Sequence, residues 1–205
     1  MRLRFLLLLV ALGLVAFSLA GCVTPTTDPS RLPAGAWSLD PGHASVTWRV
    51  RHLGLSWYTG RFDGIEASLD FDPEAPDSAR LTAILDAASL STGDAAFDTT
   101  LAQDWFHADR HPQIVFVSDR IEQTGETSGR AYGQLSMNGT TAPATLDITF
   151  YGGAFNWLAG RDMIGFGADM IVNRDDFGIG NLPQSIVGQD VHIRIEAEFL
   201  RGSDT

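Results

Sequence analysis

The chain has 205 residues, a formal net charge of −11 at pH 7 and a sequence pI of about 4.6. An acidic chain repels the phosphate backbone, which makes nucleic acid a poor candidate partner. All 14 basic residues are arginine, and the absence of lysine excludes Schiff-base and lysine-nucleophile chemistry.

Residues 1–21 have the three parts of a secretory signal peptide. Two arginines precede an apolar run that is too short for a transmembrane helix, and small residues follow it. Leu19-Ala20-Gly21-Cys22 is similar to a bacterial lipobox, in which the cysteine is lipidated and becomes the mature N-terminus. Cys22 is the single cysteine of the chain and has no internal disulfide partner. We therefore expect lipidation at Cys22 and a membrane anchor.

Residues 22–36 are rich in proline and threonine and show no apolar period. Pro25, Pro29 and Pro33 are spaced along them, which predicts a flexible tether outside the fold. Val23 in place of an aspartate after the cysteine favours the outer membrane, so we expect an envelope protein that faces the periplasm. The remaining residues predict one domain, 37–200, and a short tail, 201–205.

The first strand of this domain has an unusual inward face. Val46, Trp48, Val50 and His52 share one face of the run from His43 to His52. An indole and an imidazole on the inward side suit the wall of a cavity that holds a ligand. The alternative is an ordinary core tryptophan and a core histidine with its polar atoms satisfied.

Further alternating runs predict a series of antiparallel strands. They cover residues 55–62, 65–71, 81–85, 114–118, 129–137, 146–150, 164–172 and 191–199. Asn138-Gly139 predicts a tight hairpin. One short helix is expected between Asp94, which can cap its start, and His111, which precedes a proline.

The pattern as a whole predicts an all-β fold, an antiparallel barrel of about eight strands with one short helix. Closing the sheet removes its exposed edges. A barrel of about eight strands has room either for packed side chains or for one small ligand. The sequence leaves both alternatives open.

Five motifs occur in an order that is typical of one known family. They are Leu39-Asp40-Pro41-Gly42-His43 with Arg51-His52-Leu53-Gly54, Ser89-Leu90-Ser91-Thr92-Gly93, His111-Pro112-Gln113-Ile114-Val115-Phe116, Gly133-Gln134-Leu135-Ser136-Met137-Asn138-Gly139, and Asn173-Arg174-Asp175-Asp176-Phe177-Gly178 with Val187-Gly188-Gln189. Together they resemble the YceI-like family over roughly residues 37–199. The resemblance implies a lipocalin-like, extended barrel that encloses a long isoprenoid chain, and no established catalytic reaction.

This resemblance leads us to expect an isoprenoid lipid, either an isoprenoid quinone or a polyprenyl phosphate, in an apolar tunnel. Its role would be transport, storage or stress protection, with no catalytic cofactor and a possible homodimer. The candidate lining residues are Trp48, Val50, His52, Phe62, Leu69, Phe71, Trp105, Phe106, Phe116, Phe150, Phe166, Met170 and Phe177.

Two residues are candidates for contact with a polar headgroup. His43 could form a hydrogen bond with a quinone oxygen or a phosphate, and Arg174 could bind a phosphate with two N–H groups. The alternative for Arg174 is an ion pair with Asp175 or Asp176.

Two other classes of function remain as alternatives. His107 and His111 are four residues apart, which on a helix would place two imidazoles on one face as metal ligands, but Pro112 argues against helical geometry there. No Gly-x-Ser-x-Gly, His-Glu-x-x-His or phosphate-loop motif is present, so a hydrolase would need a triad assembled from distant residues. We expect a binding protein and no enzyme.

Overall fold

The computed structural model describes residues 25–202. The predicted signal peptide, Cys22 and the last three residues of the predicted tail lie outside them. Among the described residues, no helix is both long enough and apolar enough to cross a bilayer.

Strands make up most of the described chain. They are β1 (Gly35–His52), β2 (Ser56–Phe62), β3 (Ile65–Phe71), β4 (Arg80–Asp86), β5 (Leu90–Ser91), β6 (Gln113–Gln123), β7 (Ser128–Met137), β8 (Thr140–Asn156), β9 (Arg161–Asn173) and β10 (Asp190–Arg201). The helical elements are η1 (Pro29–Arg31), η2 (Pro76–Ser78), η3 (Ala87–Ser89), α2 (Ala95–Thr100), η4 (Leu101–Trp105) and η5 (Arg174–Phe177). The expected single helix corresponds to α2 with η4, and the others are single 3₁₀ turns.

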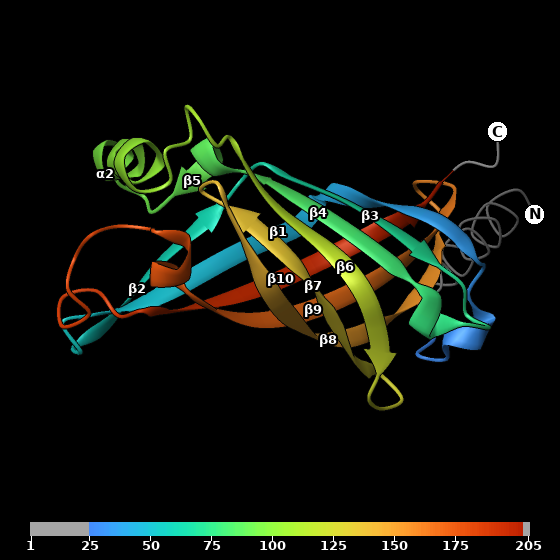
Figure 1. Cartoon of the computed structure of the whole chain (residues 1–205). Helices are drawn as coiled ribbons and strands as arrows, with labels where there is room; N and C mark the ends of the chain where they lie inside the picture. The colour runs from blue at the N-terminus through green and yellow to red at the C-terminus, as the bar shows by residue number, and fades with distance from the viewer. Residues whose placement is uncertain (1–24, 203–205) are drawn as a thin grey trace, which may run out of the picture.

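The sheet closes on itself, as predicted. Its strands follow the order β10-β9-β8-β7-β6-β4-β3-β1, and β1 pairs again with β10, so eight antiparallel strands form a closed barrel (Figure 1). The strands β2 and β5 extend this barrel at one end. The barrel therefore joins the first and last strands of the domain.

Strand β1 changes its neighbour halfway along its length. Its first residues, 35–38, pair with β3, and its last residues, 46–52, pair with β2. Between these segments, residues 40–43 form an irregularity opposite Glu198 of β10. The final part of β1 and β2 thus form a ribbon that reaches past the ring of eight strands.

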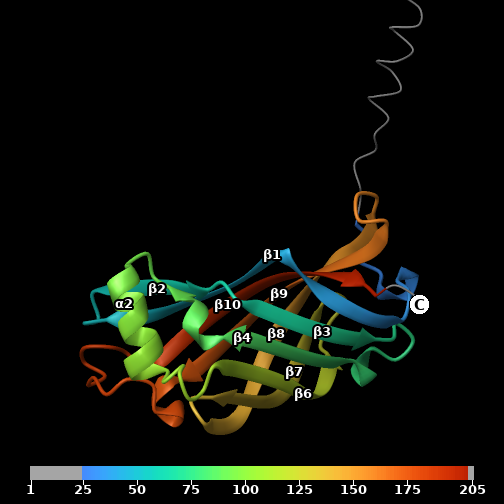
Figure 2. The same ribbon diagram turned by 90° about the horizontal axis from the view of Figure 1, so that it is seen from above.

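The helical segment α2–η4 covers one end of the barrel (Figure 2). Asp94 Oδ1 accepts hydrogen bonds from the backbone N–H groups of Ala96 at 3.0 Å and Phe97 at 3.2 Å, which confirms the predicted cap. The α-helix continues into the π-helical turn η4, which places Leu101 and Trp105 against the barrel interior. The helix therefore ends well before His111.

The prediction of a tether is wrong for the described residues 25–36. Thr26 and Gly153 of β8 exchange two backbone hydrogen bonds of 2.8 Å, and Leu32 is 7% exposed in a core cluster with Trp37. A Cβ atom at Gly153 would lie 2.5 Å from Leu32 Cδ2, and one at Gly152 would lie 2.8 Å from the Thr26 oxygen. Two adjacent glycines on β8 therefore make the room that this segment occupies.

Candidate ligand cavity

The barrel encloses an apolar cavity of about 300 Å³. Eleven of the predicted lining residues lie on its wall: Trp48, Val50, Phe62, Leu69, Phe71, Trp105, Phe106, Phe116, Phe150, Phe166 and Met170. They come from six strands of the sheet and from the α2–η4 segment, because the two-residue period of each strand sends alternate side chains inward. The volume is at the lower end of the range for small-molecule sites.

Two predicted lining residues lie elsewhere. His52 is exposed at the end of β1, where its backbone bridges to Val187, because β1 continues past the cavity in the ribbon with β2. Phe177 is buried at 4% exposure within the core but packs outside the cavity. Alternation along a strand predicts the side chain's direction and gives no information on where the cavity ends.

The exposed lining residues mark a mouth at one end of the cavity. The exposed members of its lining are Asp77, Glu122, Gln123, Glu126 and Ser128. All five come from η2 and from the β6–β7 hairpin, at the end of the barrel that also carries η1 and both ends of the described chain (Figure 1). At the other end, no described lining residue is exposed. Sequence reasoning missed these five residues because polar residues at turns carry no distinguishing signal.

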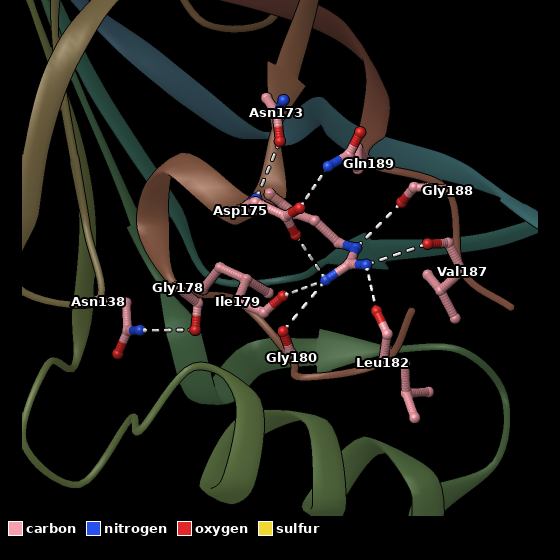
Figure 3. A network of polar contacts seen from close by, with 11 residues as sticks. Asn138, Asn173, Asp175, Gly178, Ile179, Gly180, Leu182, Val187, Gly188 and Gln189 are labelled. Carbon is pink, nitrogen blue, oxygen red and sulfur yellow. Dashed lines mark hydrogen bonds and ion pairs between the residues drawn. The ribbon is translucent and has the colours of Figure 1, made fainter. Parts of the chain in front are cut away.

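A buried arginine closes the other end. The five N–H groups of Arg174 donate hydrogen bonds to five backbone oxygens at 2.7–3.1 Å, those of Ile179, Gly180, Leu182, Val187 and Gly188 (Figure 3). Its Nη1 also lies 2.9 Å from Asp175 Oδ1, as the alternative interpretation of this residue suggested. We call Arg174 with the loop 178–189 the arginine clamp.

The headgroup prediction for Arg174 is therefore wrong. The side chain borders the cavity and is only 4% exposed, but every N–H group already has a backbone acceptor. Gly180 in the clamped loop lies beneath the ring of Trp105, since a Cβ atom there would be 2.6 Å from Trp105 Cε3. The clamp thus fixes the loop against η4 and holds the end of the barrel shut.

The headgroup prediction for His43 is also wrong. His43 is exposed in the irregular segment of β1 and is not part of the cavity wall. Its Nδ1 lies 2.9 Å from Asp40 Oδ2, and this hydrogen bond, with the charges of Asp40 and Glu198, raises the pKa of His43 above 6.5. The same hydrogen bond lowers the pKa of Asp40. His43 has the same parity as the exposed Arg49 on β1, so the alternation along this strand already places it on the outer face.

Trp48 carries the polar atom of greatest interest on the wall. Its Nε1 is buried and has no hydrogen-bond partner, and of the three such described side-chain atoms it is the one that belongs to a lining residue. The indole lies over Gly60 of β2, where a Cβ atom would be 2.3 Å from Trp48 Cζ2. The sequence indicated the indole correctly, but the unpaired N–H depends on packing and was not predictable.

The histidines of the metal hypothesis do not come together. The helix ends at Trp105, His107 has a φ of +48°, and its Nδ1 lies 3.2 Å from the Gln103 oxygen. The His111 ring instead lies over Gly139 of the β7–β8 turn. Among the described residues, Asp40, His43 and Glu198 form the one group of three whose potential metal-ligating atoms lie within 4.8 Å of one another, and neither predicted histidine belongs to it.

Comparison with known protein families gives a clear assignment. The YceI-like domain matches residues 37–199, which is most of the chain. The chain belongs to the YceI-like family. A UPF0312 protein of Pseudomonas putida (strain GB-1) is 33% identical over 156 residues, covering 75% of this chain and 80% of that protein. A UPF0312 protein of Pseudomonas fluorescens (strain SBW25) is 31% identical with the same coverage.

Solved structures support the fold of this YceI-like chain. The YCEI protein of Campylobacter jejuni has a TM-score of 0.68 at 27% identity, covering 75% of this chain and 90% of that one. Burkholderia cenocepacia BcnA has a TM-score of 0.71 at 24% identity, with 78% and 98% covered. A polyisoprenoid binding domain from Saccharophagus degradans has a TM-score of 0.58 at 10% identity, with 83% and 100% covered. At the last two identities the likeness concerns the fold alone.

Proposed function

We propose that this protein is a lipid-anchored envelope protein that binds one uncharged isoprenoid lipid, of the isoprenoid-quinone class, in its barrel. Its role is to carry, store or protect that lipid, and it acts by binding without turnover. The observation that carries the proposal is the apolar cavity with a mouth at one end, whose wall contains the residues predicted for an isoprenoid chain.

The apolar wall supplies most of the affinity. Transfer of apolar surface out of water is favourable by about 25 cal/mol per Å², so an isoprenoid tail is held without strong polar contacts. Many of the wall residues are branched aliphatic or aromatic side chains, for example Val50, Leu69, Phe116 and Phe166. Such surfaces match the methyl-branched, unsaturated chain of an isoprenoid and offer nothing to a polar ligand.

The charges of the lining argue for an uncharged head. Asp77, Glu122 and Glu126 place three carboxylates at the mouth, and Glu122 accepts a 3.1 Å contact from Arg120. Arg174 is the one cation among the described lining residues, and its five N–H groups are occupied. A phosphate would meet repulsion at the mouth and find no free cation inside. Of the two expected lipids, the quinone therefore fits and the polyprenyl phosphate does not.

The unpaired N–H of Trp48 gives such a head a place to bind. A buried donor without a partner is unfavourable by about 1–3 kcal/mol, and a ligand carbonyl would remove this penalty. A quinone has carbonyl oxygens and no charge. We infer that one carbonyl accepts a hydrogen bond from Trp48 Nε1, and that the tail extends from there along the barrel.

Two of the comparisons support a lipid-binding role. The Saccharophagus degradans domain is described as polyisoprenoid binding, and it shares the fold of this chain. Membership of the YceI-like family supports a binding protein rather than an enzyme. The anchor and the periplasmic location stand on the lipobox-like sequence ending at Cys22.

The decisive experiment is mass spectrometry of an organic extract from protein that was purified without detergent. We expect one isoprenoid quinone per chain. Ala83→Trp, which would fill the cavity from β4, should abolish this signal, whereas Val117→Trp should keep it because Val117 is 44% exposed on the outer face of the neighbouring strand. A lipid-free extract, with no uptake of added isoprenoids by folded wild-type protein, would refute the proposal. Recovery of a polyprenyl phosphate would refute the uncharged head and would leave the isoprenoid-binding barrel in place.

A further inference from the structure

The hairpin between β8 and β9 exposes a group of apolar side chains at its tip. Phe155 is 40% exposed, Trp157 is 80% exposed and Leu158 is 102% exposed. The hairpin projects away from the barrel wall beside the start of the described chain (Figure 2). Exposed apolar side chains that gather in one place are typical of a contact with a partner or a membrane.

The tip has a defined conformation. Asn156 Oδ1 accepts hydrogen bonds from the N–H groups of Leu158 at 3.0 Å and Ala159 at 3.1 Å, and the Gly160 N–H donates to the Asn156 oxygen at 2.8 Å. The rings of Phe155 and Trp157 meet edge to face with centroids 4.8 Å apart. The turn therefore holds its apolar side chains outward instead of folding them back onto the barrel.

The chain that leads to the predicted anchor leaves from the base of this hairpin. Thr26 is bound to Gly153 through two backbone hydrogen bonds. Cys22 is four positions before Thr26, and Trp157 is four positions after Gly153. Four residues span at most about 14 Å, so an acyl group on Cys22 and the indole of Trp157 have the same reach from one common point.

The mouth of the cavity lies at this same end. Pro29 of η1, three residues after Thr26, is part of the cavity lining. The exposed lining residues from η2 and the β6–β7 hairpin belong to the same end of the barrel. The start of the described chain, the β8–β9 hairpin and the mouth of the cavity therefore lie at the same end of the barrel.

We propose that residues 155–158 insert into the bilayer that carries the anchor, and that they hold the mouth of the barrel against the membrane surface. The inference rests on the anchor of the proposed function. A bilayer is the occupant that fits, because tryptophan and leucine at a hairpin tip enter the interfacial region of lipid. Arg161, which pairs with Asn156 beside the turn, is exposed and can meet lipid phosphates. An isoprenoid then moves between bilayer and cavity without crossing bulk water.

A second apolar region at the far end of the barrel provides the matched control. Leu53 is 49% exposed and Leu55 is 84% exposed at the β1–β2 turn, next to Arg51. This turn has the composition of a membrane contact but lies far from the anchor segment and the mouth (Figure 1). Comparing substitutions in the β8–β9 hairpin with substitutions in the β1–β2 turn tests whether the position of an apolar turn, and not its composition, determines membrane binding.

The test uses the mature chain with Cys22→Ser, so that no acyl group contributes to binding. Flotation with phosphatidylcholine vesicles gives the partition coefficient. We expect W157S/L158S to lower it at least tenfold and L53S/L55S to leave it unchanged. Circular dichroism on both variants verifies that the barrel is folded. Equal partition of both variants and the parent chain would overturn the proposal.

Hydrogen exchange on the vesicle-bound chain locates the contact independently of any substitution. We expect slower exchange in residues 153–161 and unchanged exchange in residues 53–56, and the reverse pattern would overturn the proposal. Neither measurement needs a bound quinone or a lipidated cysteine. The intact mass of the protein extracted from cell membranes tests lipidation separately. If Cys22 is unmodified but partition still depends on the hairpin, the anchor is rejected and the hairpin contact stands.

Discussion

Trp48 shows how one side chain combines packing with recognition. Its ring rests on Gly60, on which a Cβ atom would collide with it, and its centroid lies 6.3 Å from that of Tyr58. The indole is therefore fixed by its neighbours, and its N–H is held in one orientation, buried and without a partner. A donor that is already oriented binds an acceptor without loss of side-chain entropy.

Replacing Trp48 by Phe should separate these two contributions. The ring and most of the apolar surface stay, and the donor is lost. We expect affinity for an isoprenoid quinone to fall about 2- to 10-fold, the equivalent of one neutral hydrogen bond of about 0.5–1.5 kcal/mol. Affinity for squalene, which has no carbonyl, should stay within twofold of the wild type. Quenching of tryptophan fluorescence measures the quinone, and displacement of the bound quinone measures squalene. An equal loss for the two ligands would remove Trp48 Nε1 from the binding scheme.

The pair of Asp40 and His43 makes a prediction that NMR can test. The hydrogen bond with Asp40 raises the pKa of His43 above 6.5, so Asp40→Asn should bring this pKa back toward 6.5. The sign of the linked stability follows from the two pKa directions. The contribution of His43 is fully present below pH 6.5 and is lost as the pH rises through its raised pKa, whereas that of Asp40 is lost as the pH falls through its lowered pKa. An unchanged histidine titration in the variant would contradict the contact.

At the scale of elements, the strands were predictable and their ends were not. In β10, Val191, Ile193 and Ile195 alternate with polar residues as predicted for a strand, and this inward face lines the cavity. His52 follows the same rule on β1 and yet points into solvent, because the ribbon with β2 extends beyond the barrel. The period is a property of the single strand, while the extent of the cavity depends on which strands surround it.

The segment 25–36 shows a second limit of the sequence. Its prolines and threonines favour an extended chain, and residues 25–34 belong to no named strand. Its contact with the barrel depends on Gly152 and Gly153, which lie more than a hundred residues later and reveal nothing about their partner when read alone. Arg174 was misassigned for the same reason, since its acceptors are backbone oxygens of a loop and have no side-chain signal.

The arginine clamp predicts a large effect from one substitution. Arg174→Met should lower the free energy of unfolding by about 3 kcal/mol, because several buried carbonyl oxygens lose their donors. Arg130→Met is the control, since its 2.7 Å pair with Asp147 is exposed to solvent and should contribute little to stability. Urea unfolding measures both, and hydrogen exchange should show the loop 178–189 opening first. Similar losses in the two variants would show that the clamp is not structural.

At the scale of the whole molecule, the cavity makes stability depend on the ligand. An empty apolar cavity leaves its wall without contacts, and a ligand that binds the folded state alone stabilises it by mass action. We expect the extracted, lipid-free protein to melt at a lower temperature than the loaded protein. Adding back the quinone at 100 times its Kd should restore about 2.7 kcal/mol. Calorimetry before and after extraction tests this, and identical melting curves would mean that the cavity is already filled by side chains.

The closed end of the barrel has a kinetic consequence. With the arginine clamp at one end and the mouth at the other, a chain-like molecule leaves by the route through which it arrived. Two such molecules do not pass each other in a blind tube, so departure of the first precedes arrival of the second. Under the proposed function, delivery to an acceptor membrane should therefore reach a ceiling set by release from the barrel, and adding more acceptor should not raise it.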